Sequence, residues 1–226
     1  MKSLRIFIHT FLEILFPEQC LSCRQVGHGL LCQTCSLDLS PTVTHIDTNI
    51  ICLFSYNNSI IKQLLWELKY HSNSRAAAVI GPYLADTLVE RHADYVSLHP
   101  NSGPAILVPV PISRSRTFKR GFNQAERLAT AVTENYPDSF EVNTTLVTKI
   151  RSTKPQVKCA SRSERLSNVI GAFTVKVPTS LAHRQIIVID DVSTTGATIR
   201  EVIKVLKKNG AKNVSGLVVA HGSKTC

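Results

Sequence analysis

The chain has few aromatic residues, few acidic residues and no apolar run long enough to cross a bilayer. Aromatic side chains make up 6% of its 226 residues. Single strands of nucleic acid are held by stacking bases on aromatic rings, and only Tyr70, Phe118 and Phe122 lie near basic segments. Sequence-specific recognition of nucleic acid is therefore disfavoured. The apolar stretch over residues 6–16 contains a histidine and a glutamate and is too short to span a membrane.

That apolar stretch follows two basic residues, Lys2 and Arg5, as the core of a signal peptide would, but no small-residue cleavage site comes after it. Residues 1–19 are predicted to form an N-terminal amphipathic helix of a cytoplasmic protein. Such a helix either docks on the core of the protein or rests on a membrane surface. In the second case the protein would lie at the inner face of the membrane.

Acidic residues are scarcest in two segments, residues 112–127 and 149–165. Together these segments carry 11 basic and 2 acidic residues, which leaves the rest of the chain nearly neutral although its formal net charge is +10. Charge concentrated in this way indicates an anionic ligand, either pyrophosphate, nucleic acid or both. The alternative is a solvated basic face without a ligand.

Four of the seven cysteines form two CxxC pairs that are separated by eight residues. They are Cys20, Cys23, Cys32 and Cys35. Two such pairs are typical of a tetrahedral zinc site, and so short a segment has almost no apolar core to fold without metal. Disulfides and a redox CxxC are the alternatives, and the lack of a recognisable secretory signal disfavours disulfides. We predict a zinc-binding module over residues 20–40, with Zn²⁺ in a structural role.

Residues 186–198, IIVIDDVSTTGAT, carry the most information in the chain. A run of β-branched residues predicts a buried parallel strand that ends in Asp190 and Asp191, and an amphipathic helix follows a short hydroxyl-rich loop. Ligands of open α/β sheets bind beyond the carboxyl ends of the strands, where a helix N-terminus offers unpaired N–H groups to a phosphate. The two carboxylates suit the vicinal hydroxyls of a ribose. Alternatively, the acidic pair only caps the helix.

The remaining segments predict an α/β fold over residues 50–226, with a parallel sheet flanked by helices. Residues 40–49 are polar and are interpreted as a linker. Residues 105–111, AILVPVP, predict a second buried strand, whose prolines favour an edge or terminal position and an exit into a basic loop. Pro82 is expected to end or kink a helix over residues 76–90, and residues 92–103 are expected to form a polar loop.

The chain resembles the type I phosphoribosyltransferases, and the order of its motifs resembles the ComF family, which includes competence proteins and GntX-like proteins. The resemblance covers essentially the whole chain. The motifs that carry it are DDVSTTGAT, the strand and loop VPVPISRSRTFKRGFNQAERLA with its RGFNQ at residues 120–124, the paired cysteines preceded by Phe16-Pro17, the block Leu68-Lys69-Tyr70, and Arg151-x-Thr153-x-x-Gln156. One difference is Ser193, whose position in the signature is often apolar or aromatic.

The resemblance implies a phosphoribosyltransferase-like domain behind a zinc ribbon, binding phosphoribosyl pyrophosphate (PRPP) together with Mg²⁺. It implies catalytic roles for Asp190, Asp191 and Arg120. It assigns the 5-phosphate to Ser193, Thr194, Thr195, Gly196, Ala197 and Thr198, and the pyrophosphate to Ser113, Arg114, Arg116 and Lys69. Alternatively, Lys69 only ends its helix. His221 is the one candidate base for an acceptor, and the alternative is that it takes no part in the reaction.

The family also implies a role in natural competence, DNA uptake or the use of external DNA, with proteins of the DNA-uptake machinery as partners. Three hypotheses follow. The chain is an enzyme that transfers phosphoribosyl to an unknown acceptor, a PRPP-sensing accessory of DNA import that binds single-stranded DNA, or a nucleic-acid-binding zinc protein with a vestigial phosphoribosyl site. The intact signature disfavours the third hypothesis and leaves the first two open.

Overall fold

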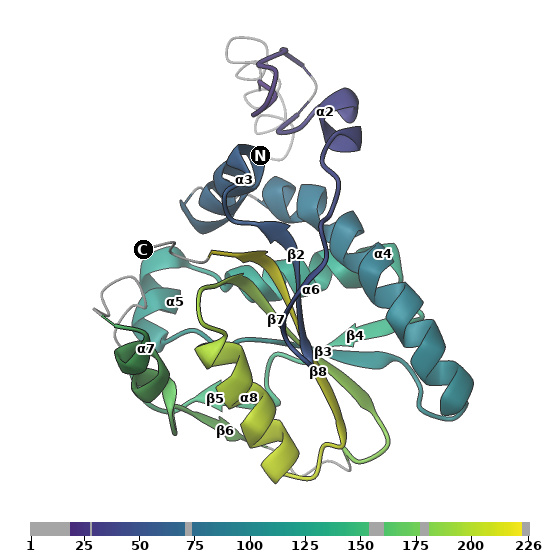
Figure 1. The fold of residues 1–226 in the computed structure, drawn as a ribbon, viewed down its shortest axis with the longest axis vertical. Coiled ribbons are helices and arrows are strands. Elements are labelled where there is room, and N and C mark those ends of the chain that lie inside the picture. Colours follow the sequence, from purple (N-terminus) through teal and green to yellow (C-terminus); the bar gives the residue numbers. More distant parts are fainter. Residues whose placement is uncertain (1–18, 28, 71–73, 154–160, 177–180, 223–226) are drawn as a thin grey trace, which may run out of the picture. The chain divides into compact units, whose positions relative to one another are not determined.

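The computed structural model describes residues 19–27, 29–70, 74–153, 161–176 and 181–222 (Figure 1). The chain divides into two compact units, Met1–Ser40 and Pro41–Cys226. The amphipathic helix predicted over residues 1–19 lies outside the described residues, except for its last position. No helix within the described ranges is both long and apolar enough to cross a membrane.

Within the described residues, the first unit contains helix α2 (Gln33–Leu37), and the strands and the other helices lie in the second unit. The strands are β1 (Thr44–Asp47), β2 (Ile50–Ser55), β3 (Ala105–Pro109), β4 (Phe140–Val142), β5 (Val147–Lys149), β6 (Phe173–Val175), β7 (Gln185–Ser193) and β8 (Asn213–His221). The helices are α3 (Ser59–Tyr70), α4 (Ser74–Leu98), α5 (Arg114–Arg120), α6 (Gln124–Asn135), α7 (Arg162–Val169) and α8 (Ala197–Lys208).

Six strands form one sheet in the order β1-β2-β8-β7-β3-β4, and β5 and β6 form a separate antiparallel pair. All pairings in the large sheet are parallel except that of β1 with β2. Apolar residues on one face of the sheet, among them Val108, Ile186 and Val188, form one buried cluster with the apolar side of α8 and with β5 and β6. Figure 1 shows α8 in front of the sheet. Helix α6 packs on β3 and β7 and against α4.

After the neighbouring parallel strands β3 and β7, the chain continues toward opposite sides of the sheet. The chain leaves β3 through α5 and α6 and returns in β4 on one side, whereas it leaves β7 through α8 and returns in β8 on the other side. Such a reversal of strand order opens a crevice at the carboxyl ends of the two strands, where open α/β sheets bind their ligands. The predicted acidic pair and basic segment follow these two strands.

The predicted α/β class is confirmed, but the linker interpretation of residues 40–49 is wrong for Thr44–Asp47. These residues form β1, which pairs with β2 at the edge of the sheet. The segment looked like a linker because most of its side chains are exposed or half-buried, as on an edge strand, so it lacks the apolar run of the central strands.

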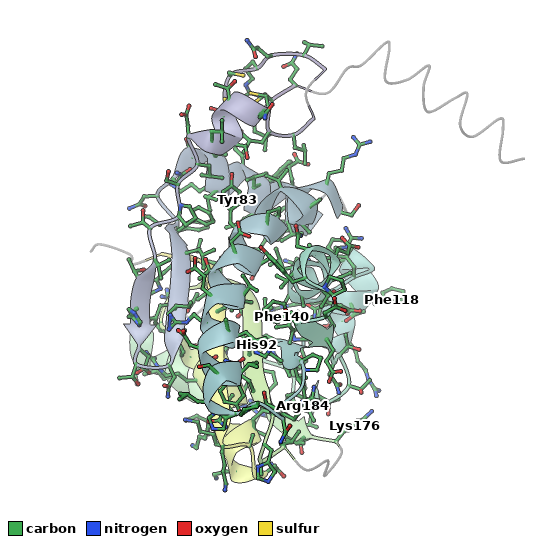
Figure 2. All side chains as sticks on the ribbon, turned by 90° about the vertical axis from the view of Figure 1, so that its right-hand side faces the viewer. Tyr83, His92, Phe118, Phe140, Lys176 and Arg184 are labelled. Atoms are coloured by element: carbon green, nitrogen blue, oxygen red, sulfur yellow. The ribbon has the colours of Figure 1, made fainter. Side chains whose placement is uncertain are left out.

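The expected break at Pro82 is absent, because α4 runs through it for 25 residues. A Cβ on Gly81 would lie 2.7 Å from Cβ of Ala131, so α4 and α6 pack closely at this point and the packing outweighs the lost hydrogen bond. Residues 92–98, expected in a loop, also belong to α4. His92 is buried against Phe140, and its Nδ1 lies 2.7 Å from Oε1 of Gln185 (Figure 2).

Of the two positions that the prolines of β3 favoured, edge or terminal, the structure has the terminal one. β3 lies between β7 and β4, and Pro109 is the last residue of the strand, where a missing N–H costs little. The basic segment after β3 is not only a loop, because Arg114–Arg120 forms α5. Phe118 on this helix is 95% exposed and projects from the surface in Figure 2.

Candidate functional site

The acidic pair lies near the carboxyl end of β7, and both of its side chains are partly buried. Nζ of Lys69, in the last turn of α3, lies 3.1 Å from Oδ2 of Asp191. The backbone N–H of Asp191 donates to Oδ1 of Asp190 at 2.9 Å, and the N–H of Val192 donates to Oδ1 of Asp191 at 2.8 Å. The structure thus brings together three of the predicted site residues, Lys69, Asp190 and Asp191, from segments far apart in the sequence.

The two carboxyl groups titrate in opposite directions. Burial, followed by the neighbouring charge of Asp191, raises the pKa of Asp190 well above its usual range. Burial alone would also raise the pKa of Asp191, but the ammonium of Lys69 outweighs it and lowers that pKa below the usual value. The pair therefore holds one carboxyl group whose charged form is stabilised by an ammonium and a second whose charged form is disfavoured by burial.

The loop between β7 and α8 is a compact turn. Gly196 adopts a left-handed conformation with φ of +74°, and its N–H donates to the buried hydroxyl of Ser193 at 2.9 Å. Helix α8 begins at the next residue, Ala197, and Gly196 supplies no side chain to cap its N–H groups. The N–H of Ala197 donates to Oγ1 of Thr195 at 3.4 Å. The N-terminus of α8 lies beside the hydroxyls of Thr194, Thr195 and Thr198, an arrangement that suits an anion.

Basic side chains surround the acidic pair on the side of α5 and β5. The guanidinium of Arg120 lies over the ring of Tyr70, with its Cζ 5.9 Å from the ring centroid, which places it beside the end of α3 that carries Lys69. The ammonium of Lys149 donates to Oγ1 of Thr153 at 2.8 Å. Burial, and then the charges of Arg116 and Arg151, lower the pKa of Lys149 to about 8, although Asp190 opposes this shift.

Lys149 is a candidate residue that the sequence analysis missed. It was counted in a basic segment, but no motif distinguished it from the other basic residues of that segment. Only the pairing of β5 with β6 places it within electrostatic reach of Arg116 and Asp190. Arg200 was missed for a similar reason, because its partner Asp47 is 153 residues away in the sequence.

Other predicted residues lie at a distance from the acidic pair or serve the local fold. Ser113 and Arg114 start α5, where Oγ of Ser113 lies 3.1 Å from Oγ of Ser115 and Arg114 is exposed. Within RGFNQ, Asn123 caps α6 by accepting from the N–H of Ala125 and donates to the carbonyl of Val110 at 3.1 Å. This segment therefore fixes the exit from β3.

A cavity of about 470 Å³ lies beside this exit, lined by residues of α4 and α6, the end of β3 and the RGFNQ segment. Its lining includes Phe122, whose ring stacks under the guanidinium of Arg127 with Cζ 3.8 Å from the centroid, and Glu126. The acidic pair does not line it. The cavity is therefore separate from the carboxylates, although the same strand end borders both.

The end of α7 and the turn after it are held by an exposed contact to the loop after β5 and by a partly buried contact to α8. The guanidinium of Arg151 donates to the carbonyls of Asn168 and Ile170 at 2.9 Å each. The carboxylate of the buried Glu201 on α8 accepts from the N–H of Gly171 at 2.8 Å. Lys154 and Gln156, which belong to the same predicted block, lie outside the described residues.

His221 ends β8, in register with Ser193 on β7 and with Ser55 on β2. It therefore sits at the same edge of the sheet as the acidic pair. Its Nδ1 is buried and has no hydrogen-bond partner among the described residues. The role of His221 as a base therefore remains a prediction, and no hydrogen-bond partner among the described residues orients its Nδ1.

The four predicted metal ligands of the first unit lie together, with their sulfur atoms all within 4.8 Å of one another. The sulfurs of Cys23 and Cys32 are 3.7 Å apart. A tetrahedral zinc ion with Zn–S bonds of about 2.3 Å places its sulfurs about 3.8 Å apart, so the arrangement fits. Burial alone would raise the pKa of Cys20, but N–H groups that point at its sulfur, from Cys32 and others, lower that pKa to about 6. The cluster can bind a metal ion.

Comparison with known proteins identifies a domain family and several relatives. Residues 118–225 match the family model of the phosphoribosyl transferase domain. The chain is 28% identical over 202 residues to the competence protein ComFC of Streptococcus pneumoniae, an alignment that covers 89% of the chain and 80% of that protein. It is 30% identical over 152 residues to the DNA utilization protein YhgH of Salmonella typhimurium, covering 67% of the chain and 63% of that protein.

Among solved structures, a hypoxanthine-guanine phosphoribosyltransferase of Leishmania tarentolae in complex with GMP matches with a TM-score of 0.39 and 14% identity, over 68% of this chain and 72% of that one. The fold and the domain match define a phosphoribosyltransferase-like protein. Within that class the chain belongs to the ComF family, as its similarity to ComFC, YhgH and the competence protein F of Haemophilus influenzae indicates.

Proposed function

We propose that the chain binds PRPP together with Mg²⁺ at the carboxyl ends of β3 and β7 and acts in natural competence or the use of external DNA. The observation that carries the proposal is the joining of Asp190, Asp191 and Lys69 in one cluster, near the end of the strand that leads to the N-terminus of α8. Names of the relatives, which include competence and DNA utilization proteins, support the physiological part.

Each part of PRPP has a chemical counterpart at the site. Carboxylates of Asp190 and Asp191 accept hydrogen bonds from the ribose 2- and 3-hydroxyls, and the loop from Ser193 to Thr198 donates to the 5-phosphate. Arg116, Arg120 and Lys149 supply positive charge for the pyrophosphate, as Lys69 does once Asp191 turns to the ribose. Mg²⁺ prefers carboxylate and phosphate oxygens and would neutralise charge on the leaving pyrophosphate.

If the chain is a phosphoribosyltransferase, the bond from C1 of the ribose to pyrophosphate breaks as positive charge grows at C1. The carboxylates of Asp190 and Asp191 favour that charge from below the ring, while Arg116, Arg120 and Lys149 favour the negative charge on the departing pyrophosphate. The contacts of Arg151 and Glu201 fix the end of α7 and the turn after it. His221 is the candidate base for the acceptor.

Calorimetry with Mg²⁺ and PRPP tests the proposal on the full chain with its metal bound. Wild type is expected to bind, and the double variant Asp190→Asn/Asp191→Asn is expected to lose binding while staying folded and keeping its zinc content. Asp86→Asn serves as the matched control, because it removes an exposed carboxylate from α4, away from the strand that carries the acidic pair. This variant is expected to bind as wild type does. A folded wild type that binds no PRPP would contradict the proposal.

A second candidate function is binding of single-stranded DNA, which the exposed side of α5 favours. Arg114 is exposed beside the 95% exposed ring of Phe118, a combination of phosphate contact and stacking surface. DNA affinity should then fall with salt, with a slope of about −0.7 per phosphate contacted. Reversing the charges of Arg114 and Arg116 to glutamate should weaken DNA and PRPP together, and unchanged DNA binding would exclude a shared surface.

We also propose Zn²⁺ as the ion of the four-cysteine cluster, in a structural role. Four thiolates fill a tetrahedral coordination sphere and leave no open position for catalysis. The spacing of the sulfurs supports this choice.

A further inference from the structure

Arg200 is the fourth residue of α8, and its side chain points back at the loop that precedes the helix. Long side chains on a helix lean toward its N-terminus, so this position suits a contact with the loop. Its Nη1 donates to the carbonyl oxygen of Thr195 at 2.5 Å. A Cβ on Gly196 would lie 3.0 Å from Cζ of Arg200, so the guanidinium lies flat against the glycine and leaves no space for a larger residue.

The other side of the guanidinium is held by the edge strand β1. Its Nε lies 2.7 Å from Oδ2 of Asp47, and its Nη2 donates to the carbonyl of Ile46 at 3.5 Å. Oδ1 of Asp47 in turn accepts from the N–H of Thr48 at 2.7 Å, which fixes the carboxylate. Three groups on two separate elements therefore hold one arginine, as its planar arrangement of donors allows.

These contacts fix the orientation of one peptide group. The C=O and N–H of a trans peptide point in opposite directions, so the carbonyl of Thr195 faces Arg200 while the N–H of Gly196 faces inward to Oγ of Ser193. The inside of the loop then presents N–H and hydroxyl donors. If this peptide turned over, the carbonyl oxygen of Thr195 would face the loop interior and repel an anion.

We infer that Arg200 is a positioning residue for a phosphate monoester, and that Asp47 holds it in place. Arg200 orients the Thr195–Gly196 peptide so that the loop offers only donors to the 5-phosphate of the ligand. The inference rests on the proposed function and adds to it a strand, β1, that the phosphoribosyl site otherwise does not use. It predicts that binding of the 5-phosphate depends on the contact of Arg200 with Asp47, which lies 153 residues away in the sequence.

Calorimetry with two separate probes distinguishes this role from a simple link between β1 and α8. Arg200→Gln is expected to weaken ribose 5-phosphate at least tenfold and to leave inorganic pyrophosphate with Mg²⁺ within twofold of wild type. Asp47→Asn is expected to have a smaller effect in the same direction. Lys204→Gln, one turn further along α8, removes the same charge away from the loop and should change neither probe. Equal binding of ribose 5-phosphate by wild type and Arg200→Gln would overturn the inference.

Arg200→Lys separates orientation from charge, because a lysine keeps the charge but cannot donate to Asp47 and Thr195 in one plane. It is expected to stay weakened, and a return to wild-type affinity would show that charge alone matters. Hydrogen exchange of the Gly196 amide gives a readout that needs no ligand. If wild type binds no phosphate ligand, the proposed function fails, and the exchange decides this inference: faster exchange in Arg200→Gln supports it, and unchanged exchange overturns it.

Discussion

At the scale of single residues, neighbours decide which of several similar side chains can act. Asp190 and Asp191 are adjacent and both partly buried, yet only Asp191 has the ammonium of Lys69 3.1 Å away. Lys149 is one of six basic residues in its segment, and its partly buried position next to Arg116 gives it a lowered pKa of about 8. The sequence shows the residue types, and the packed structure assigns them different chemistry.

Opposite pKa shifts predict opposite effects of pH on stability in the two aspartate variants. The raised pKa of Asp190 costs stability once the pH exceeds that of an unfolded aspartate, about 4. Asp190→Asn should therefore become more stable than wild type as the pH rises above that value. The lowered pKa of Asp191 contributes stability that is complete above the pKa of an unfolded aspartate, about 4, and is lost as the pH falls toward the lowered pKa. Asp191→Asn should therefore be less stable than wild type above about pH 4, and this deficit should shrink in acid.

Urea unfolding of wild type and both variants between about pH 3 and about pH 8 measures these differences, which we expect to be on the order of 1 kcal/mol for each unit of pKa shift. Curves that run in parallel for the two variants would contradict the assignment of the ion pair to Asp191.

Lys149 predicts a pH dependence of anion binding. An ammonium with a pKa of about 8 is mostly charged at pH 7 and mostly neutral at pH 9. Pyrophosphate affinity of wild type should therefore fall between these values by up to about tenfold more than that of Lys149→Arg, whose guanidinium stays charged. Calorimetry at both pH values gives the ratio of the wild-type affinity to that of Lys149→Arg. The titration of pyrophosphate itself affects both proteins equally and cancels in this ratio. A constant ratio would exclude Lys149 from the anion site.

At the scale of elements, the position of α8 depends on close packing against β8. Gly216 lies on β8 beneath α8, and a Cβ there would lie 2.6 Å from Cδ1 of Ile199 and 3.3 Å from Cδ1 of Ile203. Ile199 belongs to the first turn of α8, directly after the loop that we propose for the phosphate. The strand and the helix therefore approach each other at a glycine, and the loop takes its position from that approach.

Gly216→Val should push the first turn of α8 away from the sheet. We expect a loss of about 2 kcal/mol in the free energy of unfolding, from overpacking of a buried contact, together with weaker binding of ribose 5-phosphate. Ser215→Val, on the other face of the same strand, controls for the change in strand propensity. Denaturant unfolding and calorimetry test both effects. Stability equal to that of Ser215→Val would show that Ile199 moves aside freely.

At the scale of the whole molecule, the chain divides into a small cysteine-bearing unit and a large α/β unit. The described part of the first unit has one short helix, so its order depends on what holds the four cysteines together. The second unit has a large sheet with apolar residues on both faces. We therefore expect different forces to stabilise the two units, coordination of the proposed zinc ion in the first and burial of apolar surface in the second.

Removal of metal should unfold the first unit. A strong chelator is expected to release one zinc ion per chain and to abolish amide protection around the four cysteines, while the backbone of β7 and α8 stays protected. Hydrogen exchange with a zinc assay measures both, and Cys52→Ala, a buried thiol of β2 outside the cluster, should release the same amount as wild type. Protection of the cluster that survives chelation would contradict a structural metal.

The domain boundaries predicted at residues 20, 40 and 50 remain predictions, but the fold class was within reach of the sequence. The run Ile186–Ile189 predicted a central parallel strand, and the periodicity after Gly196 predicted α8. Elements on the margin were not predictable in this way. β1 was taken for a linker because an edge strand lacks a continuous apolar run, and α4 crosses Pro82 because its packing on α6 compensates for the lost hydrogen bond.

Taken by itself, the sequence determined the parts of this protein that rest on local order: the acidic pair after its strand, the loop and helix that follow, and the spacing of Cys20, Cys23, Cys32 and Cys35. Only the tertiary structure decided which distant residues complete the site, namely Lys69 beside Asp191 and Asp47 behind Arg200. The physical reason is that local periodicity and spacing reflect interactions within one segment. Ion pairs between segments depend on strand order, which no single segment encodes.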